Sequence, residues 1–145
     1  MKIKTAELTG SALDWAVAKA LGIRTYIGRY EHTLTGPCIL DADLVDMQTD
    51  GEQELKHSRS WAQGGPILHR ERITTHDFDG SWLAVIFERN SCVMPVKRES
   101  PAKSVFGQFV IKHRAWGLDP LEAGMRCFVT KALGDEVDVP EELLK

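Results

Sequence analysis

Two stretches of the chain place apolar residues at the spacing that buries one face of a helix. The first stretch has Leu13, Ala16, Val17, Ala20 and Leu21, and the second has Leu121, Met125, Phe128, Val129 and Ala132. Both follow the 3.6-residue period of an amphipathic helix. Start and stop residues flank the two stretches: Thr9 and Gly22 bound the first, and Asp119, Pro120 and Gly134 bound the second. The pattern predicts helices over about 10–21 and 119–133.

Strands are predicted where β-branched and aromatic residues gather. The clearest strand covers 81–88, after an Asp79-Gly80 turn, and forms a hairpin either with 69–77 or with 92–97. Further candidates are 1–8, 23–30 and 104–111. Helices with one apolar face packed on such strands predict an α+β fold, with a mostly antiparallel sheet against two principal helices. A length of 145 residues predicts a single domain over 1–145.

Charge and cysteine content narrow the classes of function. The chain has 18 basic and 21 acidic residues, and its net charge of −3 argues against nucleic acid as the partner. The longest apolar run, 82–87, is too short to cross a membrane. Three widely spaced cysteines indicate reduced thiols, and we expect a cytoplasmic protein. The basic stretch 97–114 is either a solvated face or a lobe for an anionic ligand or partner.

Known catalytic motifs are missing from the sequence. It contains no Walker loop, no G-x-S-x-G and no HExxH, and no histidine has a second histidine or cysteine four residues away. We therefore expect no catalytic residues, no bound metal and no cofactor.

One segment, 58–72, combines groups that suit a nucleotide. Trp61 offers a flat face for a base, and Gln63 offers an amide that reads the edge of a heterocycle. The run Gly64-Gly65-Pro66 is the strongest break in the chain; its glycines leave backbone N–H groups open to an anion, and Pro66 is placed to begin a short helix over 66–72. The alternative is a tight structural turn with a core tryptophan.

Arginines complete the set of candidate ligand-binding residues. Arg126 lies beside the apolar stripe of the last helix, where it either pairs with Glu122 or points into a pocket behind the helix. The full set of candidates is Trp61, Gln63, Gly64, Gly65, Arg70, Arg72 and Arg126.

Three parts of the chain carry a family resemblance: Leu13–Lys19, Trp61–Ile67, and a closing part made of Pro120-Leu121, Met125–Cys127 and Gly134–Pro140. Together they resemble the phage NinX-like family of small uncharacterised proteins. The resemblance implies a phage or prophage product that acts in the cytoplasm of the bacterial host, and it implies no known reaction. By analogy with other accessory phage proteins, it suggests a role in countering host defence.

Three functions follow as hypotheses. The first is a non-enzymatic protein that sequesters a nucleotide-like small molecule, such as a host immune signal. The second is an accessory protein that inhibits or regulates a host protein through the acidic segments 41–54 or 135–142. The third is a nucleotide hydrolase built from scattered His and Asp residues. We favour the first, and expect a homo-oligomer, most simply a dimer, since Trp15, Trp82 and Trp116 are many large rings for a small core.

Overall fold

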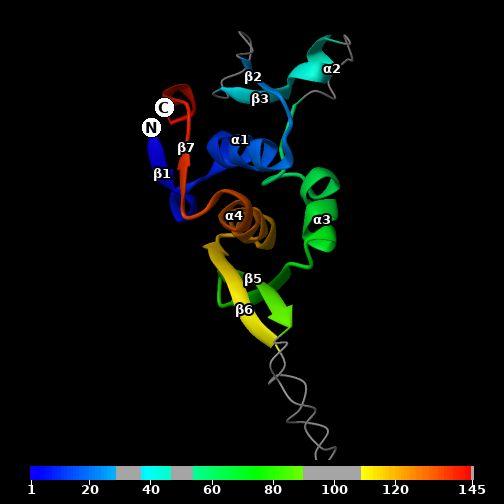
Figure 1. Cartoon of the computed structure of the whole chain (residues 1–145), viewed down its shortest axis with the longest axis vertical. Helices are drawn as coiled ribbons and strands as arrows, with labels where there is room; N and C mark the ends of the chain where they lie inside the picture. Colours follow the sequence, from blue (N-terminus) through cyan, green and yellow to red (C-terminus); the bar gives the residue numbers. More distant parts are fainter. Residues whose placement is uncertain (29–36, 47–53, 90–108, 145) are drawn as a thin grey trace, which may run out of the picture.

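The computed structural model has helices at the centre and small antiparallel sheets around them (Figure 1). It describes residues 1–28, 37–46, 54–89 and 109–144. The elements are β1 (Lys2–Lys4), η1 (Thr5–Glu7), α1 (Gly10–Leu21), β2 (Thr25–Gly28), β3 (Cys38–Asp41), α2 (Ala42–Asp46), α3 (Trp61–Arg70), β4 (Thr74–Phe78), β5 (Ser81–Arg89), β6 (Phe109–Gly117), α4 (Pro120–Leu133), β7 (Glu136–Asp138) and η3 (Glu141–Leu143). The predicted α+β class is confirmed.

Both predicted principal helices are present as α1 and α4. Gly22 ends α1 in the left-handed conformation, with φ 74°. Asp119 caps α4, because its carboxylate accepts a hydrogen bond of 2.8 Å from the backbone N–H of Glu122. Pro120 occupies the first turn, where its missing N–H has no helical acceptor to lose. The apolar period and the flanking residues were therefore sufficient to predict these two helices.

The largest sheet is antiparallel and has the order β4-β5-β6. Asp79 and Gly80 join β4 to β5 with φ of 53° and 91°, the backbone that a two-residue hairpin favours. The predicted turn is confirmed, and the strand before it is the hairpin partner. The other predicted partner, 92–97, lies outside the described residues, as do residues 104–108 of the strand predicted over 104–111.

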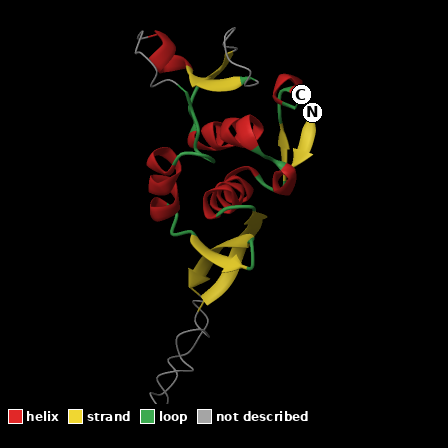
Figure 2. Ribbon diagram, turned by 180° about the vertical axis from the view of Figure 1, so that it is seen from behind, coloured by secondary structure: helices red, strands yellow, loops and turns green. Residues whose placement is uncertain are grey.

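Helix α4 is the centre of the packing. It lies between α1 and the three-stranded sheet, with α3 beside it (Figures 1 and 2). Small residues make this possible on the sheet side: a Cβ on Gly117 would come within 2.5 Å of the backbone nitrogen of Ala123. On the other side, Met125 and Val129 are fully buried with residues of α1. The two principal helices therefore pack on each other, and of the helices in the described ranges it is α4 that covers the sheet.

The Gly64-Gly65-Pro66 run does not break the chain. It lies inside α3, which begins at Trp61, so the predicted short helix starting at Pro66 is wrong. The reason is tertiary. Gly64 is buried, and a Cβ there would overlap the carbonyl oxygen of His57 and lie 2.6 Å from a methyl carbon of Leu121. Gly64 is thus a point at which α3 closely approaches the turn before it and α4.

Two small sheets complete the described fold. β1 pairs with β7, so the predicted strand over 1–8 is limited to its first part, and β2 pairs with β3. Trp15 is partly buried against the core. Cys38 and Cys127 are buried thiols. In the described parts of the chain, no helix combines the length and the apolar character needed to cross a bilayer.

The two neighbouring glycines of α3 give a matched stability test. We expect Gly64→Ala to lower the free energy of unfolding by about 1–3 kcal/mol, since the new methyl group overlaps the His57 carbonyl. Gly65→Ala meets only Trp61, at 3.7 Å, and should raise stability by about 0.5–1 kcal/mol through helix propensity. Denaturant unfolding of both variants checks this. Equal effects at the two positions would contradict the close approach at Gly64.

Candidate functional site

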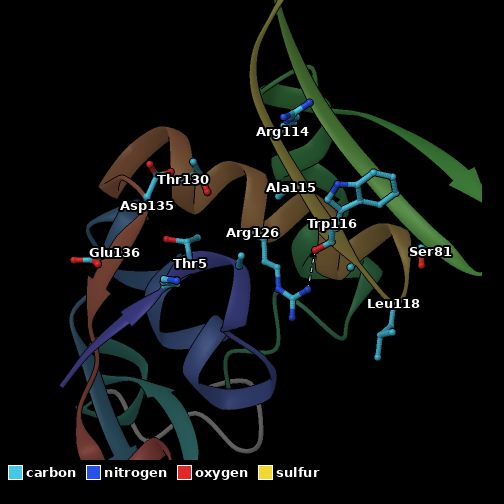
Figure 3. A pocket seen from close by; sticks show the side chains of 13 residues that line it. Thr5, Ser81, Arg114, Ala115, Trp116, Leu118, Arg126, Thr130, Asp135 and Glu136 are labelled. Atoms are coloured by element: carbon cyan, nitrogen blue, oxygen red, sulfur yellow. Dashed lines mark hydrogen bonds between the residues drawn. The ribbon is translucent and has the colours of Figure 1, made fainter.

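A pocket of about 790 Å³ opens between β6, α4 and the paired segments β1, η1 and β7 (Figure 3). Its wall includes Thr5 on one side and Arg114 and Trp116 on the other, with Arg126 between them, and Lys4 also lines it. The volume lies within the range of about 300–1,000 Å³ that is usual for small-molecule sites. Segments from both ends of the chain therefore meet at one concave surface.

Arg126 is held firmly in this wall. Its Nε donates to the carbonyl oxygen of Leu8 at 2.8 Å, and its Nη1 donates to the carbonyl oxygen of Trp116 at 2.7 Å. Its Nη2 donates to Glu122 Oε1 at 2.8 Å, which makes a buried ion pair one helical turn apart. A guanidinium has five N–H groups, so these three bonds leave two for a ligand. The sequence analysis offered two interpretations of Arg126, a pair with Glu122 or a place in a pocket. Both hold, since Arg126 pairs with Glu122 and also lines the pocket.

The other cations of the pocket have no such partner. Lys4 and Arg114 are exposed, and in the described chain neither side chain forms an ion pair or a hydrogen bond, although Lys4 lies opposite Glu136 in the strand pairing. Two carboxylates, Asp135 and Glu136, lie on the β7 side together with Thr130 (Figure 3). The pocket is therefore charged unevenly, with its unpaired arginine on β6 and its carboxylates at the β7 side.

Trp116 provides an aromatic group at the β6 side. Its carbonyl oxygen points to Arg126, while its indole ring extends away from the guanidinium (Figure 3). The ring packs edge-on against Phe78, with ring centroids 5.6 Å apart, and about half of the residue remains exposed. A planar face thus stands at the edge of the pocket, on the same side of β6 as Arg114 and turned away from Arg126.

In the segment 58–72, which was predicted to bind a ligand, Gln63 and Gly64 form hydrogen bonds within the fold. Both ends of the Gln63 amide are occupied: its oxygen accepts from the backbone N–H of Lys56 at 2.6 Å, and its nitrogen donates to the Glu54 carbonyl at 3.0 Å. The N–H of Gly64 donates to the Ser60 carbonyl at 2.8 Å. The expectation of unshielded N–H groups at Gly64 is therefore wrong, because these groups stabilise the start of α3.

The remaining residues of that segment point outward. Trp61 is 58% exposed, so it is not the core tryptophan of the alternative interpretation. Arg70 pairs with Glu71 on the surface, and Arg72 is exposed with φ 54°. Of the seven candidate residues only Arg126 lines the pocket, and none of those between 61 and 72 does. Whether Trp61, Gly65, Arg70 and Arg72 contact a ligand stays a prediction.

The sequence analysis did not identify Lys4, Arg114 and Trp116 as residues that line the pocket. Arg114 is the last residue of the basic stretch 97–114, for which a lobe binding an anion was one interpretation. The other two carried no local signal, because Lys4 reaches the pocket only through the pairing of β1 with β7.

A second polar cluster joins α1 to the turn before α3. Asp14 is fully buried; its carboxylate accepts from the backbone N–H of Ser58 at 2.7 Å and from Arg59 Nη2 at 2.9 Å. His57 is buried next to it. Desolvation lowers the pKa of His57, against the opposite effect of the Asp14 charge. The hydrogen bonds of Asp14 thus hold the turn 57–59 in place, and Gly64 of α3 lies close to the His57 carbonyl of this turn.

Thiols and carboxylates form no obvious reactive centre in the described residues. Burial raises the pKa of the Cys127 thiol to about 12, which leaves it protonated and inert. Within the described ranges no three His, Cys, Asp or Glu side chains are grouped to hold a metal ion. Some acidic residues of the segments 41–54 and 135–142 have partners inside the fold, since Asp43 pairs with Arg24 and Asp138 with the N-terminal amine.

The family model described as bacteriophage P22 NinX matches residues 4–132. The chain belongs to the NinX family. The resemblance noted in the sequence is thereby confirmed, and the matched range of this NinX-family protein contains both walls of the pocket on β6 and η1. No curated protein matches the chain.

Removing Arg126 should destabilise the protein strongly. Arg126→Met leaves Glu122 as a buried charge without its partner and frees two carbonyl oxygens, so we expect a loss of about 3–5 kcal/mol in the free energy of unfolding. Arg70→Met breaks a surface pair and should cost about 0–1 kcal/mol. Chemical denaturation of both variants measures the difference, and similar losses would show that the buried pair is not needed.

His57 predicts a pH dependence of stability. Because its pKa is lowered in the folded state, the unfolded chain takes up the proton first as the pH falls below the ordinary value of about 6.5. Its contribution is therefore complete above that value and declines, by at most about 1.4 kcal/mol per pH unit, as the pH falls toward the lower folded-state pKa.

The comparison that isolates this effect uses His57→Gln, which cannot take up a proton. Between about pH 7.5 and 5.5, above the range in which carboxylates titrate, wild type should lose more stability than His57→Gln. Parallel slopes for the two proteins would show that His57 has the same pKa in the folded and unfolded states.

Proposed function

We propose that this NinX-family protein binds a nucleotide-like anion in the Arg126 pocket and holds it without converting it. The observation that supports the proposal is the presence of two unpaired cations, Lys4 and Arg114, and an aromatic ring around one concave surface. A phosphate needs N–H donors and positive charge, and a base needs a planar face. The pocket supplies both kinds of group.

The need for N–H donors, positive charge and a planar face first suggested the segment 58–72 as the nucleotide site. The pocket suits a nucleotide better. At Gln63 and Gly64 the hydrogen-bonding groups are already used by the fold. In the pocket, Arg126 keeps two N–H groups and Arg114 keeps its whole guanidinium. A ligand gains more from donors that have no other acceptor.

Sequestration rather than catalysis fits the lining of the pocket. The described lining contains no histidine or cysteine, and its two carboxylates lie on the β7 side, away from Arg114. In a phage protein acting in the host cytoplasm, tight binding alone withholds a nucleotide signal from its receptor. This is how we relate the pocket to the proposed role in countering host defence.

Calorimetric titration with AMP, ATP and cyclic di-AMP tests the proposal. Arg114→Ala should weaken binding by roughly tenfold or more, since a hydrogen bond to a charged group contributes about 1.5–3 kcal/mol. Arg70→Ala is the matched control; it removes an exposed arginine outside the pocket and should leave the affinity unchanged.

Two outcomes would contradict the pocket as the site. One is the absence of binding of all three nucleotides to wild type. The other is binding that Arg70→Ala or Trp61→Ala weakens and Arg114→Ala does not, which would return the site to the 58–72 segment.

A further inference from the structure

The three-stranded sheet has one face covered by α4 and a second face, here called the open face, on which Val85 at the centre is buried and the large apolar residues toward both ends are exposed. Ala84 and Ile86 of β5 and Ala115 of β6 pack under α4. Because side chains alternate along a strand, Leu83, Val85 and Phe87 lie on the opposite face. Cross-strand pairing adds Trp116 beside Leu83 and Arg114 beside Val85. No described helix packs on this second face, which Figures 1 and 2 show turned away from α4.

A bulge in β6 enlarges the apolar part of the open face. Ile86 pairs with His113 but Phe87 pairs with Ile111, so Lys112 is an extra residue in β6. Regular alternation would place Ile111 on the α4 side with His113. The bulge instead places it across from Phe87 on the open face, where both are nearly half exposed.

Four large apolar residues of this face are exposed to solvent. Phe78 is 54% exposed, Trp116 49%, Ile111 47% and Phe87 43%. The described side chains of the face include Arg114 and His76 but no carboxylate. The face is thus apolar at both ends of the sheet, with one permanent cation between them.

We propose that this open face is the interface of a homodimer, in which the sheets of two copies pack face to face about a two-fold axis parallel to β5. The axis places β6 of one copy over β4 of the other. Arg114 then faces the hydroxyl of Thr74 in the second copy and not another Arg114, because Thr74, Val85 and Arg114 share one row of the sheet. The Trp116–Phe78 pairs of the two copies come together in the same way.

The area of the face agrees with this occupant. Aromatic residues bury about 150–250 Å² each, so the three half-exposed aromatic residues, together with Ile111, offer roughly 400 Å² of apolar surface. The exposed Thr74, Ser81, His76 and Arg114 form a polar rim. Core and rim together approach the ~800 Å² per partner of a standard stable interface.

A second copy fits the face better than a nucleic acid does. Binding to a nucleic-acid backbone needs several phosphates neutralised by cations, and the described part of this face has Arg114 alone as a permanent cation, in a chain of net charge −3. An isologous interface needs apolar surface that packs on itself, and this face has such surface at each end. The proposal does not depend on ligand binding, although Arg114, Trp116 and Ser81 belong both to this face and to the pocket wall.

Sedimentation velocity at micromolar concentration tests the interface. Wild type should sediment at twice the 16.2 kDa mass of the chain. Trp116→Asp and Phe87→Asp, at opposite ends of the face, should each give a monomer with unchanged far-ultraviolet circular dichroism. Trp61→Asp is the matched control, since Trp61 is also an exposed tryptophan but lies on α3 outside this face, and it should remain dimeric.

A monomeric wild type would overturn the proposal, and so would a dimer that survives both substitutions on the face. Fluorescence anisotropy with a labelled single-stranded oligonucleotide covers the competing occupant. Binding that Phe87→Asp abolishes, from a wild type that sediments as a monomer, would assign the face to nucleic acid instead.

Discussion

The ion pair of Arg126 and Glu122 is the interaction on which the positions of the other elements depend. The arginine binds the carbonyl oxygens of Leu8 and Trp116, and the glutamate accepts from the N–H of Leu118 at 2.8 Å. Two charges inside a protein are stabilising only when their hydrogen-bonding groups are satisfied. Here that requirement fixes the entry to α1, the end of β6 and the first turns of α4 relative to one another, and the pocket lies where these three segments meet.

The parts of the fold that follow from local chemistry were predictable. The caps and apolar periods of α1 and α4 depend on residues within each helix, and the Asp79-Gly80 hairpin depends on two adjacent residues. Helix α3 was not predictable, because two glycines and a proline disfavour a helix locally. Its formation reflects the close contact of Gly64 with His57 and Leu121, residues 7 and 57 positions away in the chain.

In the candidate site, too, local contacts were predictable and long-range contacts were not. Arg126 was identified because it flanks an apolar stripe, and its bond to Glu122 one turn away is a local relation. Its bonds to Leu8 and Trp116 connect separate elements, and so does the approach of Lys4 through β1 and β7. The side of the sheet on which Ile111 lies depends on the bulge at Lys112, which the strand pattern does not reveal. The features of the site that the sequence did not predict are therefore those that depend on contacts between distant segments of the chain.

The pairing of β1 with β7 also constrains the order in which the protein folds. Lys2 lies opposite Asp138, and the carbonyl oxygen of Met1 accepts from the N–H of Val139 at 2.9 Å. During synthesis β1 therefore emerges long before its partner β7. Until α4 has also been made, the entry to α1 lacks its anchor, since Leu8 is held by Arg126 of α4. The pairing of β1 with β7 is thus a late, long-range step of folding.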